Sequence, residues 1–233
     1  MALWGTIVNA LAIIAGGILG SFIPKLAEGI RTTVMQGLGM TIVVLGVSMS
    51  FKTENILIAV VSLVVGGIIG ELMKIDRMLE IVGMKLEKIV GSRLKGNIAA
   101  GFVTATLIYC VGAMAILGAI DGGLRHNHDI LYTKAALDGF TAVIFASTLG
   151  IGVMFSAIPV FLYQGLIALS ATWITHFLSD GLLNGVIREV TAVGGILIVG
   201  IGLNILEIKK INVANLLPSL IIAAIAVLVL SLV

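Results

Sequence analysis

"GFVTATLIYCVGAMAILGAIDGGL", residues 101–124, is apolar enough to lie in a lipid bilayer, yet it contains two threonines, a tyrosine, a cysteine and several glycines. Its first charged residue is Asp121. Glycine lowers helix stability, and clustered small residues let neighbouring backbones approach closely. The stretch therefore predicts a membrane helix that is either tightly packed or loosened to form part of a binding site.

The whole chain has the composition of an integral membrane protein. Of its 233 residues, 59% are hydrophobic and 11% are charged, and the mean hydropathy is +1.20. Charged residues cluster between apolar runs, each near or above the roughly 20 residues that cross a bilayer as a helix. We predict an all-α polytopic membrane protein with about eight transmembrane helices, at residues 4–23, 35–51, 54–73, 98–119, 137–157, 159–178, 189–206 and 212–232.

Lysine and arginine are more frequent in cytoplasmic loops than in outer loops. If the loop after the third span is cytoplasmic, ten of the fourteen basic residues lie on that side. The other four are Lys52, Arg125, Lys134 and Arg188, which this arrangement assigns to outer loops. Both termini are then predicted to face the outside of the cytoplasmic membrane.

The long loop after the third span, residues 74–97, has apolar residues at helical spacing, namely Leu79, Val82, Leu86 and Ile89. Its charged residues fall largely on the other side of such a helix. The pattern predicts a cytoplasmic amphipathic helix. Such a helix either lies at the membrane interface or caps the helix bundle.

An internal repeat relates the two ends of the chain. Residues Gly29–Ser48 align without a gap on Gly185–Asn204, and six of the twenty positions are identical. The matching pairs are Gly29 with Gly185, Val34 with Val190, Gly39 with Gly195, Ile42 with Ile198, Val43 with Val199 and Gly46 with Gly202. With one-residue shifts, Ser62 aligns with Ser219 and Asn9 with Gln164. The first three spans therefore resemble the last three.

The central spans form a second, weaker pair, because Gly101–Ala119 aligns with Gly139–Ala157 and places Gly112 on Gly150. In both pairs the offset is an odd number of spans, so related spans cross the membrane in opposite directions. The chain is thus predicted to be one transmembrane domain with inverted-topology repeats, divided into residues 1–73, 74–97, 98–157 and 158–233. Such repeats are common in secondary transporters and occur in some channels.

Small polar residues in the central spans are the candidate site, because lipid offers hydroxyl groups no partner. The predicted substrate-binding residues are Asn9, Thr104, Thr106, Tyr109, Cys110, Gly112, Ser147, Thr148, Gly150 and Gln164, and Thr141 and Ser156 belong to the same hydroxyl set. For each glycine the alternative is tight helix packing, and for Asn9 and Gln164 it is a hydrogen bond that holds two helices together.

The predicted spans have no charged residue at their centres, since Glu71 and Asp138 fall at span ends. A carboxylate-based proton relay is therefore not expected. The substrate is predicted to be a small neutral solute, or a cation held by hydroxyl and carbonyl oxygens. Neither a metal nor a cofactor is predicted, because Cys110 is alone and the segment from His126 to Asp129 is expected to be solvated.

Three motifs in order resemble the YdfK/YqgA-like family of bacterial inner-membrane proteins, a domain-of-unknown-function family: "GTIVNALAIIAGGILGS", "CVGAMAILGAIDGGL" and "KAALDGFTAVIFASTLGIGVMFSAIPVFLYQG". The resemblance implies a bacterial cytoplasmic-membrane location and a transporter role. It brings no substrate and no functional residues.

We expect a transporter, with an ion channel on the same scaffold or a structural or regulatory membrane protein as alternatives. An enzyme is not expected, because no HExxH or GxSxG motif and no intramembrane Asp pair occurs. The expected partners are the lipid bilayer and a small solute or ion, with a homo-oligomer possible and no nucleic acid.

Overall fold

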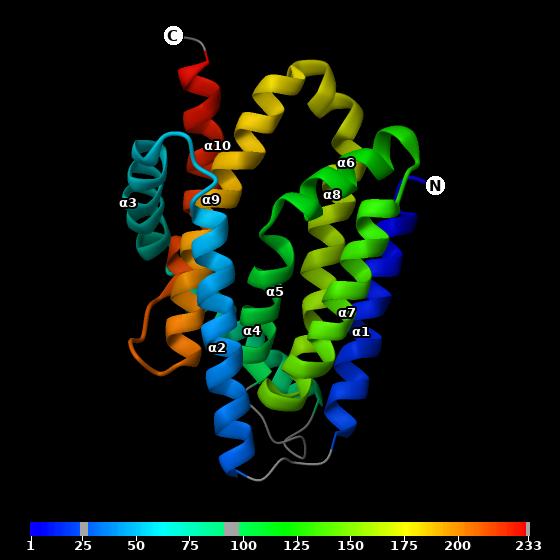
Figure 1. Ribbon diagram of the computed structural model, residues 1–233, viewed down its shortest axis with the longest axis vertical. Coiled ribbons are helices and arrows are strands. Elements are labelled where there is room, and N and C mark those ends of the chain that lie inside the picture. The colour runs from blue at the N-terminus through cyan, green and yellow to red at the C-terminus, as the bar shows by residue number, and fades with distance from the viewer. Residues whose placement is uncertain (24–27, 91–97, 232–233) are drawn as a thin grey trace. The chain divides into compact units, whose positions relative to one another are not determined.

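The computed structural model describes residues 1–23, 28–90 and 98–231, and these residues form helices and no strand. Figure 1 shows the elements in order. Their bounds are α1 Trp4–Phe22, α2 Glu28–Ser50, α3 Ile56–Met73, α4 Ile75–Val90, α5 Ile98–Cys110, α6 Ala113–Arg125, α7 Asp129–Leu149, η1 Ile151–Ser156, α8 Ala157–Phe177, α9 Asp180–Ile205, η2 Val213–Leu216 and α10 Pro218–Leu230.

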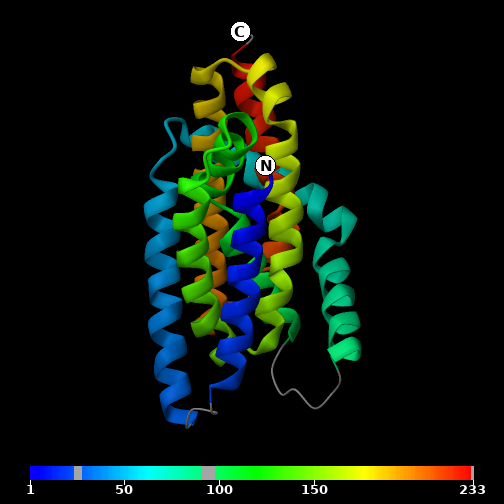
Figure 2. The same cartoon turned by 90° about the vertical axis from the view of Figure 1, so that its right-hand side faces the viewer.

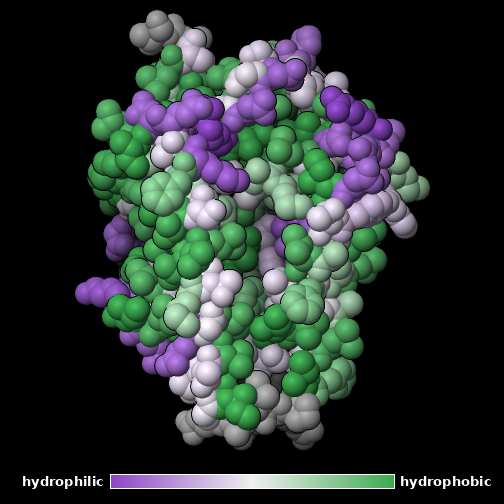
Figure 3. Space-filling model, viewed as in Figure 1, coloured by the Kyte–Doolittle hydropathy of each residue, from purple (hydrophilic) through white to green (hydrophobic). Residues whose placement is uncertain are grey.

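Seven of the described helical stretches are long and apolar enough to cross a membrane, or eight if the bent pair α5 and α6 is one span. Large apolar side chains are exposed along them, as on Val44, Leu57 and Leu166, and Figure 3 shows hydrophobic residues over much of one face. Such exposure is unfavourable in water and favourable in lipid. The prediction of an all-α polytopic membrane protein is confirmed.

Some predicted span boundaries were wrong. The fifth span was expected at 137–157, but α7 begins at Asp129 and ends at Leu149, where Gly150 has a φ of 97°. The fourth span does not stop at 119, because α5 and α6 continue to Arg125 with a bend of 62° at residues 111 and 112. The seventh begins at Asp180, since Ser179 caps the helix by accepting a bond from the Leu182 amide. Polar helix ends hid these boundaries from a prediction based on hydropathy.

The described helices form two compact units, whose ranges are Met1–Arg31, Leu79–Cys110 and Met114–Ile174 for unit 1, and Thr32–Met78, Val111–Ala113 and Thr175–Val233 for unit 2. Each unit contains helices from the first and from the last of the predicted repeats. The division at 1–73, 74–97, 98–157 and 158–233, which follows the repeats, stays a prediction.

Unit 1 is built on glycine contacts between α1 and α7. A Cβ on Gly16 would lie 2.2 Å from the carbonyl oxygen of Gly139, and one on Gly20 would lie 2.2 Å from that of Val143. These contacts make α1 and α7 parallel. Figure 2 shows α1 between α7 and α8. Side chains larger than hydrogen at Gly16 and Gly20 would push the two helices apart.

Two further pairs in unit 1 are antiparallel. Helix α1 runs against the η1 and α8 segment, with Leu3 near Gly165 and Gly17 near Met154. Helix α5 runs against α7, because its start lies near Leu149 and its end lies near Thr141. These two pairs, α1 with α8 and α5 with α7, are the ones that the repeat alignment relates.

Unit 2 contains the other two antiparallel pairs, α2 with α9 and α3 with α10. A Cβ on Gly46 would lie 2.6 Å from the carbonyl oxygen of Gly195, and one on Gly202 would lie 3.0 Å from that of Gly39. The repeat alignment pairs Gly39 with Gly195 and Gly46 with Gly202. The contact from α2 to α9 is therefore matched by the equivalent contact from α9 to α2.

The predicted amphipathic segment 74–97 is described as a helix from Ile75 to Val90, and residues 91–97 lie outside the described residues. A left-handed Lys74 ends α3, and α4 begins at the next residue. Met78, Ile81, Val82 and Met84 of α4 are exposed. The location of α4 at the cytoplasmic interface stays a prediction.

Candidate functional site

A buried ion pair lies in the middle of α7, in unit 1. Lys134 Nζ is 2.9 Å from Asp138 Oδ1 and 2.7 Å from Oδ2, and each side chain is 9% exposed. The two residues are one helical turn apart, a spacing at which side chains meet. Asp138 is the tenth of the 21 residues of a helix long enough to cross a membrane.

This pair overturns the expectation that no charge lies within a span. Lys134 was assigned to an outer loop and Asp138 to a span end, and the structure places both inside α7. The span predicted at residues 137–157 begins eight residues after the start of α7, and Lys134 therefore fell outside it. A carboxylate therefore does lie inside a helix long enough to cross a membrane.

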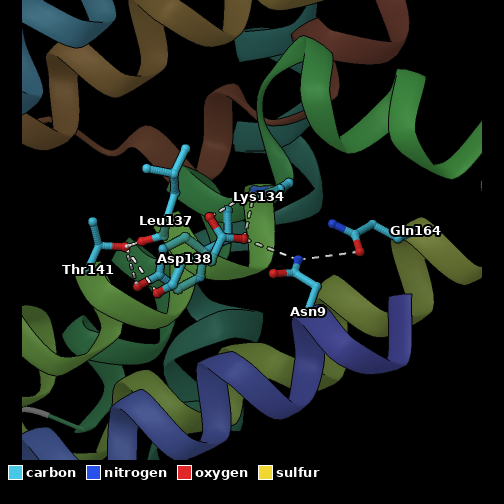
Figure 4. A network of polar contacts seen from close by, with 7 residues as sticks. Asn9, Lys134, Leu137, Asp138, Thr141 and Gln164 are labelled. Atoms are coloured by element: carbon cyan, nitrogen blue, oxygen red, sulfur yellow. Dashed lines mark hydrogen bonds and ion pairs between the residues drawn. The ribbon is translucent and has the colours of Figure 1, made fainter. Parts of the chain in front are cut away.

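Two amide side chains extend the ion pair to the neighbouring helices (Figure 4). Asn9 of α1 donates from Nδ2 to Asp138 Oδ2 at 3.1 Å and to Gln164 Oε1 of α8 at 3.4 Å. Both amides are completely buried. Because a carboxylate only accepts hydrogen bonds, Asp138 fixes which end of the Asn9 amide is nitrogen.

The amides are only partly satisfied. Asn9 Oδ1 and Gln164 Nε2 are buried and have no hydrogen-bond partner among the described residues. Thr6 Oγ1, one turn before Asn9 on α1, is buried in the same way. A buried polar group without a partner costs about 1–3 kcal/mol. The cluster thus retains one free acceptor and one free donor on adjacent amides.

The aromatic ring of Tyr109, on α5, lies beside the ion pair. Tyr109 is 1% exposed, and Lys134 Nζ lies 5.9 Å from the centre of its ring. Its hydroxyl accepts a hydrogen bond from Thr141 Oγ1 at 3.3 Å, and its ring stacks on Phe145 at 6.3 Å. A cation over an aromatic face gains electrostatic energy, more so away from water. Tyr109 therefore helps to hold the Lys134 ammonium inside the protein.

We define the polar cluster as Asn9, Lys134, Asp138 and Gln164, with Tyr109 and Thr141 against it. A buried ion pair is costly to desolvate and is rare in membrane spans, where it commonly marks a substrate or ion pathway. The pair is internally neutral, so the cluster presents no net charge. It can hold a small molecule by hydrogen bonds, or exchange the Lys134 ammonium for another cation at Asp138.

Three of the predicted site residues belong to this arrangement, namely Asn9, Tyr109 and Gln164, together with Thr141 from the hydroxyl set. The structure does not bring Ser147 and Thr148 to it. Their hydroxyls donate to the carbonyl oxygen of Ile144 in their own helix, at 2.8 Å and 3.0 Å. Ser156 likewise donates to Val153 at 2.7 Å. Backbone carbonyls are a common partner for hydroxyls inside membrane helices.

The remaining predicted residues of the fourth span lie on α5 or at its end. Thr104 and Cys110 are half-buried, and Thr106 buries its hydroxyl oxygen without a hydrogen-bond partner among the described residues. Gly112 has a φ of 148°, and a Cβ at this position would meet nothing within 4 Å. The role of Gly112 is therefore conformational, and the alternative of close helix packing is wrong at this position.

Gly112 and Gly150 are the two glycines with positive φ among the described residues, at 148° and 97°. The alignment of the central spans pairs these same two positions. Each ends a helix, α5 before Gly112 and α7 before Gly150. The helix in residues 101–124 is thus interrupted at Gly112, where the backbone has a φ that residues other than glycine adopt with difficulty.

Lys134 and Asp138 were missed, although the sequence contains a signal for them. Charges four apart with opposite sign, flanked by Ala135, Ala136 and Gly139, form a pair that is neutral and surrounded by small residues. Such a pair can enter a span where an isolated charge cannot. Starting the span at Asp129 would have included it.

A second set of buried polar contacts lies in unit 2. Glu189 of α9 is 2% exposed, and it accepts hydrogen bonds from the Thr53 hydroxyl and the Glu54 backbone amide. Arg188 pairs with Glu54. These groups tie the turn between α2 and α3 to α9, so we interpret them as structural.

The chain matches the family described as "Protein of unknown function (DUF554)" over residues 4–228. It belongs to the DUF554 family. No solved structure matches it. The match includes all four residues of the polar cluster, from Asn9 to Gln164.

Two relatives of this DUF554 protein match over nearly their whole length. "Uncharacterized membrane protein YdfK" of Bacillus subtilis (strain 168) is 35% identical over 232 residues, which cover 97% of this chain and 96% of that protein. "Uncharacterized protein YqgA" of Escherichia coli (strain K12) is 30% identical over 224 residues, 94% of each chain. The name of the Bacillus subtilis relative describes a membrane protein, in agreement with a membrane location for the DUF554 chain.

Proposed function

We propose that this DUF554 protein is a secondary transporter of a small neutral solute or a cation across the bacterial cytoplasmic membrane. The polar cluster of Asn9, Lys134, Asp138 and Gln164 is the binding site. The observation that carries the proposal is the Lys134–Asp138 ion pair, buried in a membrane-length helix and bonded to Asn9. Maintaining that pair costs desolvation energy, and a purely structural helix contact does not require it.

Antiparallel pairing of repeat-related helices supports alternating access. In unit 1 the cluster joins α1 and α8, one helix from each proposed repeat, through the bond between Asn9 and Gln164. Two related helices that run in opposite directions can exchange their environments when a transporter opens to the other side. Helix breaks at Gly112 and Gly150 supply places where such a movement can bend the backbone.

The proposed orientation has both termini outside. The basic residues predicted to be cytoplasmic still outnumber those predicted to lie in outer loops. The difference is larger than predicted, because Lys134 is buried in α7 and is not in an outer loop. Arg125 is the last residue of α6, and His126 directly follows it. In the proposed orientation this turn faces outward. No catalytic role is proposed for any residue.

A two-stage experiment tests the function. Purified protein is screened for a rise in melting temperature against sodium, potassium, ammonium and small neutral metabolites, since a ligand of the folded state stabilises it. Each stabilising solute is then followed by counterflow into proteoliposomes, with unitary currents recorded in planar bilayers. Saturable counterflow without unitary currents supports a transporter. Unitary currents instead support the channel, and neither signal with any solute supports a structural protein.

A further inference from the structure

We propose that the polar cluster recognises a small uncharged solute that presents a hydrogen-bond donor and an acceptor on neighbouring atoms, as a primary carboxamide does; this rests on the proposed transport function. Within the described part of the chain, Asn9 Oδ1 is a buried acceptor without a donor, and Gln164 Nε2 is a buried donor without an acceptor. Both side chains are 0% exposed.

The other polar groups of the cluster already satisfy one another. Asp138 accepts two hydrogen bonds from Lys134 and one from Asn9, and Gln164 Oε1 accepts one from Asn9 Nδ2. The remaining hydrogen-bonding capacity is thus one acceptor on Asn9 and one donor on Gln164. A ligand that fills it must offer the complementary donor and acceptor.

The two unpaired atoms are close enough for one small molecule to bridge them. Asn9 Nδ2 and Gln164 Oε1 are 3.4 Å apart. Because the nitrogen and oxygen of one amide are about 2.3 Å apart, the two unpaired atoms are separated by at most about 8 Å. One carboxamide with a hydrogen bond of about 2.9 Å at each end spans up to about the same distance.

Charge favours a neutral solute over an ion. The Lys134 ammonium is held at 2.7 Å and 2.9 Å by the Asp138 carboxylate, so neither charge is available without breaking the pair. Breaking a buried pair costs about 3–5 kcal/mol. An ion or a zwitterion would have to offset that cost, whereas a carboxamide leaves the pair intact. Hydrogen bonds from a ligand to both unpaired amide atoms would also remove the penalty that these atoms bear without one.

The probes for the test are acetamide and N,N-dimethylacetamide, which differ in that the second lacks an N–H donor. Binding is measured as the rise in melting temperature of the purified full chain and as saturable binding of radiolabelled acetamide. We expect acetamide to bind and N,N-dimethylacetamide to bind at least about tenfold more weakly, because one buried hydrogen bond and its desolvation are lost. Sodium chloride, ammonium chloride and glycine are measured in parallel.

The variants assign the effect to the amides. Gln164→Leu and Asn9→Leu are each expected to weaken acetamide binding at least about tenfold. Gln164→Met keeps the approximate size but has no hydrogen-bond donor, and it is expected to lose acetamide binding even if Gln164→Leu does not fold. Ser62→Ala is the matched control and keeps wild-type binding, because it removes a fully buried α3 hydroxyl that has no hydrogen-bond partner in the described ranges.

Equal binding of the two acetamides, or full binding by Gln164→Met, overturns the inference. Stabilisation by sodium, ammonium or glycine without any by acetamide also overturns it, while leaving a transporter of another substrate in place. If the wild type binds neither acetamide nor any ion, and counterflow is absent with the whole metabolite panel, the proposed function fails together with the inference.

Discussion

Asn9 and Gln164, which the repeat alignment makes equivalent, share one hydrogen bond of 3.4 Å across the antiparallel helices α1 and α8. In an object with two-fold symmetry, a residue that contacts its own equivalent lies beside the axis. The reciprocal contacts of Gly46 and Gly202 in unit 2 have the same character. These relationships support the predicted inverted repeats, and in unit 1 the polar cluster joins one helix from each predicted repeat.

Single substitutions in the ion pair are expected to destabilise the protein more than the double substitution. Asp138→Leu leaves Lys134 buried without its carboxylate, and Lys134→Met leaves Asp138 without its ammonium. Each should lower the free energy of unfolding by about 3–5 kcal/mol, whereas the double variant should lose much less. Chemical unfolding in detergent measures all four proteins as a double-mutant cycle. Additive losses, with the double variant the least stable, contradict a coupled buried pair.

Gly112→Ala and Gly150→Ala are expected to lower the unfolding free energy by about 1–2 kcal/mol each, because alanine is strained at positive φ. Gly37→Ala is the control: Gly37 is inside α2 with nothing within 4 Å of a Cβ. It should be neutral or stabilising by up to about 1 kcal/mol. The melting temperatures of the three variants are compared. Wild-type stability in both Gly112→Ala and Gly150→Ala would contradict a positive φ at these two positions.

Gly46→Ala and Gly202→Ala are expected to impair folding to a similar degree, because each Cβ would meet the backbone of the opposite helix within 3.0 Å. Gly185→Ala, on α9, would make an ordinary 3.5 Å contact with Val227 and should be tolerated. Expression level and thermal stability are the readouts. A severe effect at one glycine and none at its equivalent would count against the reciprocal packing.

Much of the fold could be predicted from composition, whereas the charged centre of the site was missed although its i,i+4 spacing is visible in the sequence. Apolar runs predicted the membrane class and the number of spans, and the repeat placed Asn9 with Gln164. The polar first turns of α7 and α9 misled a prediction based on hydropathy. Hydropathy counts each charged residue separately, so it does not register that Lys134 and Asp138 neutralise each other within one helix. Ser147 and Thr148 were predicted to bind substrate, but their hydroxyls donate hydrogen bonds to a backbone carbonyl oxygen of their own helix.

The proposed orientation is tested by cysteine labelling in a Cys110→Ala background. Cysteine at His126, which is exposed after α6, should react with an impermeant reagent from outside the cell. Cysteine at Met84, exposed on α4, should react only after the membrane is opened. Cytoplasmic labelling of the His126 position would reverse the orientation.

Asn9→Leu and Gln164→Leu should abolish solute binding and leave a folded protein, because leucine needs no hydrogen-bond partner in a span. If the two amides only hold helices together, the same variants should lose about 0.6 kcal/mol of stability and keep their ligand. Melting temperatures with and without the stabilising solute distinguish the two roles. Unchanged affinity in both variants would remove these residues from the site.

Aqueous access to the buried position of Asn9 tests the central claim most directly, and it needs no known substrate. Asn9→Cys in the Cys110→Ala background is exposed to a small, charged, membrane-impermeant thiol reagent, first on intact cells and then on inverted vesicles. Ser62→Cys, at an equally buried position of α3, is the control. Alternating access predicts that the cysteine at position 9 reacts from both sides while the one at position 62 reacts from neither. Failure of the position 9 cysteine to react from either side would contradict a transport pathway through the polar cluster.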